Sequence, residues 1–104
     1  MKQTKKLADQ SIAQQEAFIH QQAQDTQNII FTKHALKRMK ERRIAAPSVI
    51  ETLRQGRMKR PAEANIQTGS LECRLERHIA GRDIAVVVAI DDEDPSLIVV
   101  TAMD

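Results

Sequence analysis

The sequence is short of several residue types, and each shortage excludes a class of protein. Trp and Tyr are absent and Phe occurs only twice in 104 residues, so the core must be built from aliphatic side chains. The single cysteine, Cys73, cannot form an internal disulfide or make a zinc site alone, which excludes disulfide-knot and zinc-finger folds. With three Gly and three Pro, the chain is not collagen-like. A chain of this length is one domain with, at most, an appendage.

Long hydrophobic runs and metal-binding clusters are missing as well. The longest apolar run, Ile84–Ile90, is far shorter than the roughly 20 residues that a membrane span needs. The N-terminus is rich in Lys and Gln rather than apolar, unlike a signal peptide. No Cys/His cluster has the spacing of metal ligands, and no glycine-rich phosphate loop is present. We therefore expect a cytoplasmic protein without a membrane segment, metal or cofactor.

Positive charge is concentrated in one part of the chain. Residues 33–60 contain ten Lys and Arg against only two acids, Glu41 and Glu51. Residues 83–104 contain six acids and no base. The basic segment is the only candidate binding region for an anionic partner.

The N-terminal residues have a composition that favours a helix. Residues 3–25 are rich in Gln and Ala and contain no Gly or Pro. Gln15 and Glu16 interrupt a stripe of apolar residues at helical spacing, formed by Ala8, Ile12, Ile19 and Ala23. Residues 1–27 are thus predicted to be a helical appendage that docks on the domain or on a second subunit, with a disordered tail as the alternative.

Two further helices are predicted from their end signals. Thr32 is a good N-cap for a helix that runs to about Arg43. Pro47 suits the first turn of a third helix, and Gly56 stands where a C-terminal residue with a left-handed backbone belongs. We expect these helices to form a short hairpin that turns three apolar side chains inward: Val49, Ile50 and Leu53.

After the third helix the apolar pattern changes to a period of two. Leu71, Cys73 and Leu75 alternate with charged residues, as in a strand with one buried face. Gly81 then indicates a tight turn. The segment Ile84–Ile90 is apolar at every position, which is typical of a central strand covered on both faces.

The remaining strands complete the fold prediction. A last strand is expected over residues 97–101, and a weaker one within residues 58–67. The order of elements predicts that residues 28–104 form an α+β domain, a two-helix hairpin packed on a three- or four-stranded antiparallel sheet. The N-terminal helix is expected to cover the small-residue face of the central strand, formed by Ala85, Val87 and Ala89. On a flexible joint it could instead pack on a neighbouring copy and so form a homodimer.

The residues that could carry chemistry lie on the second helix and on one strand. His34, Arg38 and Arg42 recur at i, i+4 and i+8 and share one helix face. Metal-independent RNA cleavage needs a general base and cations that stabilise the phosphorane, and these three residues could supply both. Alternate residues of a strand project from one face, so His78 shares a face with Arg74 and Glu76. This face could lie in the same groove as the basic residues of the second helix.

Each of these sets can also be explained by a purely structural role. The basic residues of the second helix could form a solvated face, with His34 as a partly buried hydrogen-bonding residue. His78 could belong to the polar side of an edge strand. Cys73 is at an inward position, where a thiol usually acts as a small hydrophobic residue rather than a nucleophile.

The segment Phe31–Ile44, F-T-K-H-A-L-K-R-M-K-E-R-R-I, resembles the signature H-A-x-x-R-M-x-E-R-x-I of the bacterial family called domain of unknown function 4258. The resemblance extends over about residues 29–103. Within the signature the matching polar residues are His34, Arg38, Glu41 and Arg42. Further matching positions are Val49, Ile50, Leu53, Gly56, the turn at Gly81-Arg82, and Val99–Thr101.

That family is similar to the RelE and MqsR toxins, small α+β proteins with helices packed on an antiparallel sheet. The resemblance therefore implies a RelE-like fold, an endoribonuclease-type activity and a cognate antitoxin protein as partner. It carries no catalytic role over to any single residue.

Three functions follow as hypotheses. The first is a toxin-type protein that contacts RNA through its basic helix, as a metal-independent endoribonuclease with His34, Arg38, Arg42 and His78 as its candidate site. The second is a non-catalytic interaction module that self-associates or binds a partner through its N-terminal helix. The third is a DNA-binding accessory protein. Because aromatic stacking residues are scarce, any nucleic-acid binding should be sequence-tolerant and weakened by salt.

Overall fold

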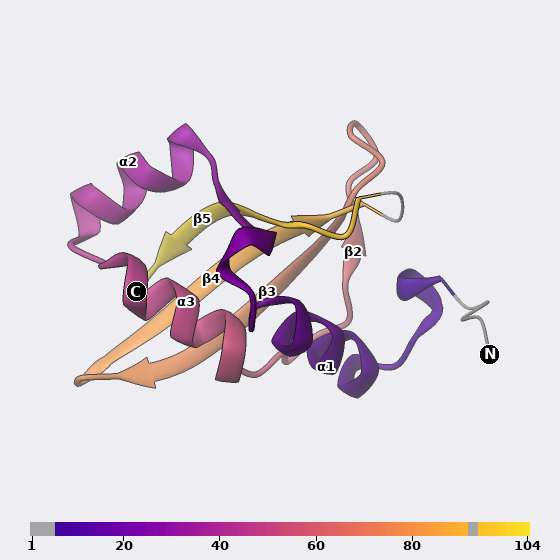
Figure 1. The fold of residues 1–104 in the computed structure, drawn as a ribbon, viewed down its shortest axis with the longest axis horizontal. Helices are drawn as coiled ribbons and strands as arrows, with labels where there is room; N and C mark the ends of the chain where they lie inside the picture. Colours follow the sequence, from indigo (N-terminus) through magenta and orange to yellow (C-terminus); the bar gives the residue numbers. More distant parts are fainter. Residues whose placement is uncertain (1–5, 92–93) are drawn as a thin grey trace.

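A computed structural model describes residues 6–91 and 94–104 (Figure 1). Its helices are α1 (Ile12–Gln22), α2 (Lys33–Arg42) and α3 (Ala46–Gln55). Its strands are β1 (Ile29–Phe31), β2 (Glu63–Ala64), β3 (Leu71–Ile79), β4 (Arg82–Ile90) and β5 (Leu97–Met103). Two short 3-10 helices, η1 (Leu7–Asp9) and η2 (Thr26–Asn28), precede α1 and β1. The α+β class predicted from the sequence is confirmed.

The sheet is larger than predicted and is not purely antiparallel. Its five strands run in the order β1-β5-β4-β3-β2, and β1 pairs parallel to β5 while the other neighbours are antiparallel. The prediction of three or four antiparallel strands is therefore wrong in number and in direction, since β1 adds a fifth strand that runs parallel to its neighbour. Three residues directly before a helix cap are too few to show a period of two. Their pairing comes from β5, far along the chain, as in the contact of Ile29 with Leu97.

The core lies between the helices and one face of the sheet. Alternate residues of β4 are buried on this face: Ile84, Val86, Val88 and Ile90. They form one cluster with Val49 and Leu53 of α3 and with Ala35 and Met39 of α2. The hairpin of α2 and α3, packed over the aliphatic strands, is as the sequence predicted (Figure 1).

The N-terminal helix does not cover the face on which it was expected. Instead α1 packs against α3, and its Ile19 and Ala23 join the core cluster (Figure 1). The small residues of β4 lie on the opposite side of the sheet, which we call the outer face, where Val87 is paired with the exposed Arg74. The predicted cover of Ala85, Val87 and Ala89 by this helix is thus wrong.

The polar residues of α1 explain where the helix docks. Gln15 is fully buried, and its side-chain amide donates to the carbonyl oxygen of Leu7 at 2.9 Å. Its Oε1 accepts from the main-chain N–H of Ala62 at 2.9 Å, and Glu16 Oε1 accepts from that of Met58 at 2.8 Å. The two residues that interrupt the apolar stripe are therefore the ones that attach α1 to the segment 57–62.

The helix and turn signals were correct in two places and wrong in a third. Thr32 caps α2 by accepting from the N–H of Ala35 at 3.0 Å, and the Gly81 turn is present with a φ of 81°. Gly56, by contrast, has an extended backbone with a φ of −72°, so the predicted left-handed conformation is wrong. This position requires glycine for a different reason, because a Cβ there would lie 2.3 Å from the carbonyl oxygen of Thr52.

Candidate functional site

Five basic residues lie on α2, and we call them the α2 basic face: Lys33, Lys37, Arg38, Lys40 and Arg42. Lys33, Lys37 and Lys40 are exposed on the side of the helix away from the buried Ala35 and Met39, Arg42 is also exposed, and Arg38 is half-buried. The one acid of the helix, Glu41, pairs with Arg38 at 2.9 Å across one helical turn. No other residue of the face forms an ion pair with the part of the chain that the structure describes.

The candidate residues of α2 have different surroundings. His34 is exposed in the first turn, and Arg38 is engaged with Glu41. Arg42, at the far end of the helix, donates from Nη1 to the carbonyl oxygen of Ala102 at 2.9 Å. At about 1.5 Å per residue, His34 and Arg42 are about 12 Å apart along the helix axis.

The C-terminal end of α2 is held by a residue from the β3–β4 turn. Arg82 donates to the carbonyl oxygens of Arg42 and Arg43, each at 2.7 Å, and so satisfies carbonyls that have no partner within the helix. Its guanidinium also contacts Asp104, with Nε 3.1 Å from Oδ2. The hydrogen bond from Arg82 lowers the pKa of Asp104, and the charges of Arg82 and Arg42 act in the same direction.

His78 lies on β3 rather than on α2 and has a partner that sequence analysis missed. Its Nδ1 lies 2.7 Å from Oδ1 of Asp83, on an exposed part of the β3–β4 hairpin. The pairing could have been found from the turn at Ala80-Gly81, since a two-residue hairpin turn places residue 78 opposite residue 83. Arg74 pairs with Glu76 at 3.3 Å rather than with His78.

The four candidate residues lie outside two hollows of the described residues. None of His34, Arg38, Arg42 and His78 lines either hollow. His34 and His78 are positioned by separate elements, α2 and β3, and no hydrogen bond or ion pair in the described ranges joins them.

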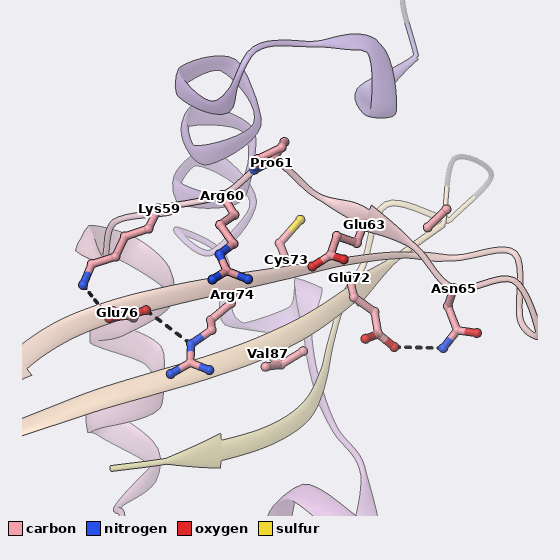
Figure 2. Close-up of a pocket in the computed structure, with 11 residues that line it drawn as sticks. Lys59, Arg60, Pro61, Glu63, Asn65, Glu72, Cys73, Arg74, Glu76 and Val87 are labelled. Carbon is pink, nitrogen blue, oxygen red and sulfur yellow. Dashed lines mark hydrogen bonds and ion pairs between the residues drawn. The ribbon is translucent and has the colours of Figure 1, made fainter.

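The larger hollow is a groove of about 650 Å³ along the edge of β3, which we call the β3 groove (Figure 2). The segment 57–64 pairs with β3 at both ends of this groove, through Arg57 with Glu76 and through Glu63 with Glu72. Between these points the chain leaves the strand, because the N–H groups of Met58 and Ala62 bond to side chains of α1.

Charged side chains line the β3 groove in two groups. At one end Glu76 accepts from two cations, with Lys59 at 3.1 Å and Arg74 at 3.3 Å, and Arg60 reaches toward them (Figure 2). At the other end are Glu63 and Glu72, the latter bonded to Asn65 at 3.0 Å.

Cys73 lines the floor of the groove but does not add reactivity. Its side chain is 1% exposed, and burial raises the pKa of the thiol to about 12. The thiol is therefore protonated at neutral pH and poor as a nucleophile, as the sequence position predicted. Within residues 6–91 and 94–104 no group of three His, Cys, Asp or Glu side chains is arranged to hold a metal ion. None of the helices in these ranges is long and apolar enough to cross a membrane.

Fold and surfaces together define a small α+β protein with a basic helix beside one end of a five-stranded sheet and a charged groove at the other end. A family model, Domain of unknown function (DUF4258), matches residues 31–104, and the chain belongs to this family. The family expected from the sequence is thereby confirmed. The matched region begins in β1, so α1 precedes it. No curated protein and no solved structure matches the chain.

Proposed function

We propose that this protein binds RNA through the α2 basic face, as a toxin-type protein similar to RelE and MqsR. The observation that carries the proposal is that Lys33, Lys37 and Lys40 are exposed on one helix and have no carboxylate partner among the described residues. Unpaired cations at a fixed spacing attract a phosphate backbone and release its counterions on binding.

The anchoring of α2 supports this role. Thr32 caps its first turn, Arg82 holds its last carbonyls, and two of its apolar side chains are buried in the core. The cations are therefore presented on a helix whose position is fixed before the nucleic acid arrives, which reduces the ordering cost of binding.

The proposal concerns binding rather than cleavage. RNA cleavage without a metal needs a base and cations around one phosphate, and His34, with Arg38 one turn away, lines neither of the two hollows of the described residues. A role for α1 as a dimer interface has less support. Its buried residues, Gln15, Ile19 and Ala23, already pack on their own chain.

The test is a binding titration of a fluorescent single-stranded RNA against salt. The triple variant Lys33→Gln, Lys37→Gln, Lys40→Gln should weaken binding and reduce the slope of log K against log salt by about 2, because each phosphate contact contributes roughly 0.7 for single strands. The matched control removes three cations at the other end of the sheet: Arg57→Gln, Lys59→Gln, Arg60→Gln.

Three outcomes would contradict the proposal. They are an affinity that does not change with salt, an equal loss in both triple variants, and tighter binding of duplex DNA than of RNA. The last of these would favour a DNA-binding accessory protein.

A further inference from the structure

The β3 groove is a second surface, separate from the α2 basic face. It lies at the β3–β2 end of the sheet, whereas α2 packs on β5, so β4 stands between them. Its volume of about 650 Å³ falls within the range of roughly 300–1,000 Å³ typical of sites for small molecules.

The edge of β3 offers main-chain groups to this groove. Glu76 exchanges two hydrogen bonds with Arg57, both at 2.9 Å. Main-chain groups along a strand point alternately to its two neighbours, so those of Arg74 point the same way as those of Glu76. Arg74 lies where the segment 58–62 has moved away from β3. Its N–H and C=O are therefore directed into the gap, as on the open edge of a sheet.

The charges of the groove are separated along its length. One end has three cations, Lys59, Arg60 and Arg74, and one carboxylate, Glu76, which pairs with Lys59 and Arg74, so its formal charge is +2. At the other end Glu63 and Glu72 give −2 (Figure 2). Arg60 and Glu63 have no ion-pair partner in the described ranges. A ligand complementary to this groove has an anionic group at one end and a cationic group at the other.

The ends of the groove limit the length of its ligand. The segment 57–64 pairs with β3 at Glu72 and at Glu76, which are four residues apart. At about 3.3 Å per strand residue, the gap between these two points is about 13 Å long. An extended chain of three residues spans about 10 Å. A longer peptide running along β3 would meet Arg57 or Glu63, whereas a short one fits with both of its termini inside.

We propose that the β3 groove binds a free peptide of about three residues in its zwitterionic form. The peptide carboxylate lies at Arg60 and Arg74, its ammonium group lies at Glu63 and Glu72, and its main chain pairs with that of Arg74. This orientation makes the bound peptide parallel to β3. Open strand edges bind extended peptides in this way, with main-chain hydrogen bonds giving affinity and side chains giving selectivity.

The groove depends on the segment that precedes the family region. Gln15 and Glu16 of α1 hold Ala62 and Met58, the two ends of the stretch that stands away from β3. Because the family match begins at residue 31, the wall that carries Lys59 and Arg60 is supported by residues outside that match.

The experiment is an NMR titration of the full ¹⁵N-labelled chain with three probes: Ala-Ala-Ala, its N-acetyl derivative and its C-terminal amide. We expect saturable shifts in residues 58–65 and 72–76 with Ala-Ala-Ala. Each derivative, which lacks one charged end, should bind about tenfold more weakly, as expected for the loss of one charge-assisted hydrogen bond.

Single-charge variants assign each end of the peptide. Arg60→Gln should weaken Ala-Ala-Ala binding about tenfold while leaving the affinity for the C-terminal amide unchanged. Glu63→Gln should weaken Ala-Ala-Ala but not the N-acetyl derivative. Lys37→Gln, on the α2 basic face, is the matched control and should bind like the wild type. Preserved peak dispersion in each variant confirms that it is folded.

Several results would overturn this proposal. These are no saturable shift with any probe, equal affinities for the three probes, an equal effect of Lys37→Gln, and inorganic phosphate binding to the same residues as tightly as Ala-Ala-Ala. The last would define a simple anion site. None of them bears on RNA binding, because the RNA test uses cations on α2.

Discussion

The guanidinium of Arg82 donates from Nη2 to the carbonyl oxygen of Arg42 across 2.7 Å, so the turn of one hairpin holds the last turn of a distant helix. The contact joins two positions at which the sequence resembles the family, the basic signature of α2 and the Gly81-Arg82 turn. It indicates that part of that resemblance reflects the architecture rather than a reaction.

Replacement of Arg82 by Ala should therefore destabilise the fold. It leaves the carbonyls of Arg42 and Arg43 without their donor and Asp104 without its partner. We expect a loss of about 1–2 kcal/mol and a Tm lower by roughly 5–10 °C, measured by thermal unfolding. Arg77→Ala is the control, since Arg77 is equally exposed but only pairs with the side chain of Glu51. Equal Tm values for the two variants would contradict the proposed role.

The lowered pKa of Asp104 predicts how stability depends on pH. Its pKa in the folded state is held below the ordinary value of 3.8, so the group stabilises the fold above that pH. The stabilisation is lost as the pH falls through the folded pKa. Between about pH 6 and about pH 2, Asp104→Asn should thus show a smaller decrease in Tm than the wild type. Parallel Tm curves for the two proteins would show that Asp104 contributes nothing.

Gln15 should be more important for stability than its polar character suggests. Gln15→Ala leaves the N–H of Ala62 without its partner and removes one of the two donors to the carbonyl oxygen of Leu7, which keeps the N–H of Gln10 at 3.1 Å. The cost should be about 2 kcal/mol or more in urea unfolding. Gln21→Ala, at an exposed position of the same helix, is the control and should change stability by less than about 0.5 kcal/mol. Faster hydrogen exchange at Ala62 in the Gln15 variant alone would locate the effect at this contact.

Local signals in the sequence predicted the parts of the fold that depend on local physics. The cap at Thr32, the alternation along β3 and the aliphatic run of β4 each identify an element from neighbouring residues. β1 was missed because its three residues acquire their conformation from pairing with β5.

The position of Gln15 shows a second limit of periodicity. In the sequence, a buried polar side chain looks like a break in an apolar stripe. Gln15 is nevertheless buried, because its side chain forms hydrogen bonds with main-chain groups from elsewhere in the chain. The β3 groove was missed for the same reason, since it exists only where residues 58–62 bond to α1 instead of β3. For the candidate site, the basic helix was visible in the sequence, whereas the pairing of His78 with Asp83 requires the register of the hairpin.

His34→Ala separates a functional role from a structural one. The His34 side chain is exposed, and no hydrogen bond in the described ranges involves it, so the substitution should change Tm by less than about 2–4 °C. If the protein acts as a toxin through α2, expression of the wild type should arrest growth, and His34→Ala should relieve the arrest without loss of folded protein. Lys6→Ala, an exposed position outside α2, is the control and should leave the arrest unchanged. Wild-type expression that is harmless would exclude the toxin, while an arrest that persists in the His34 variant would remove this histidine from the candidate site.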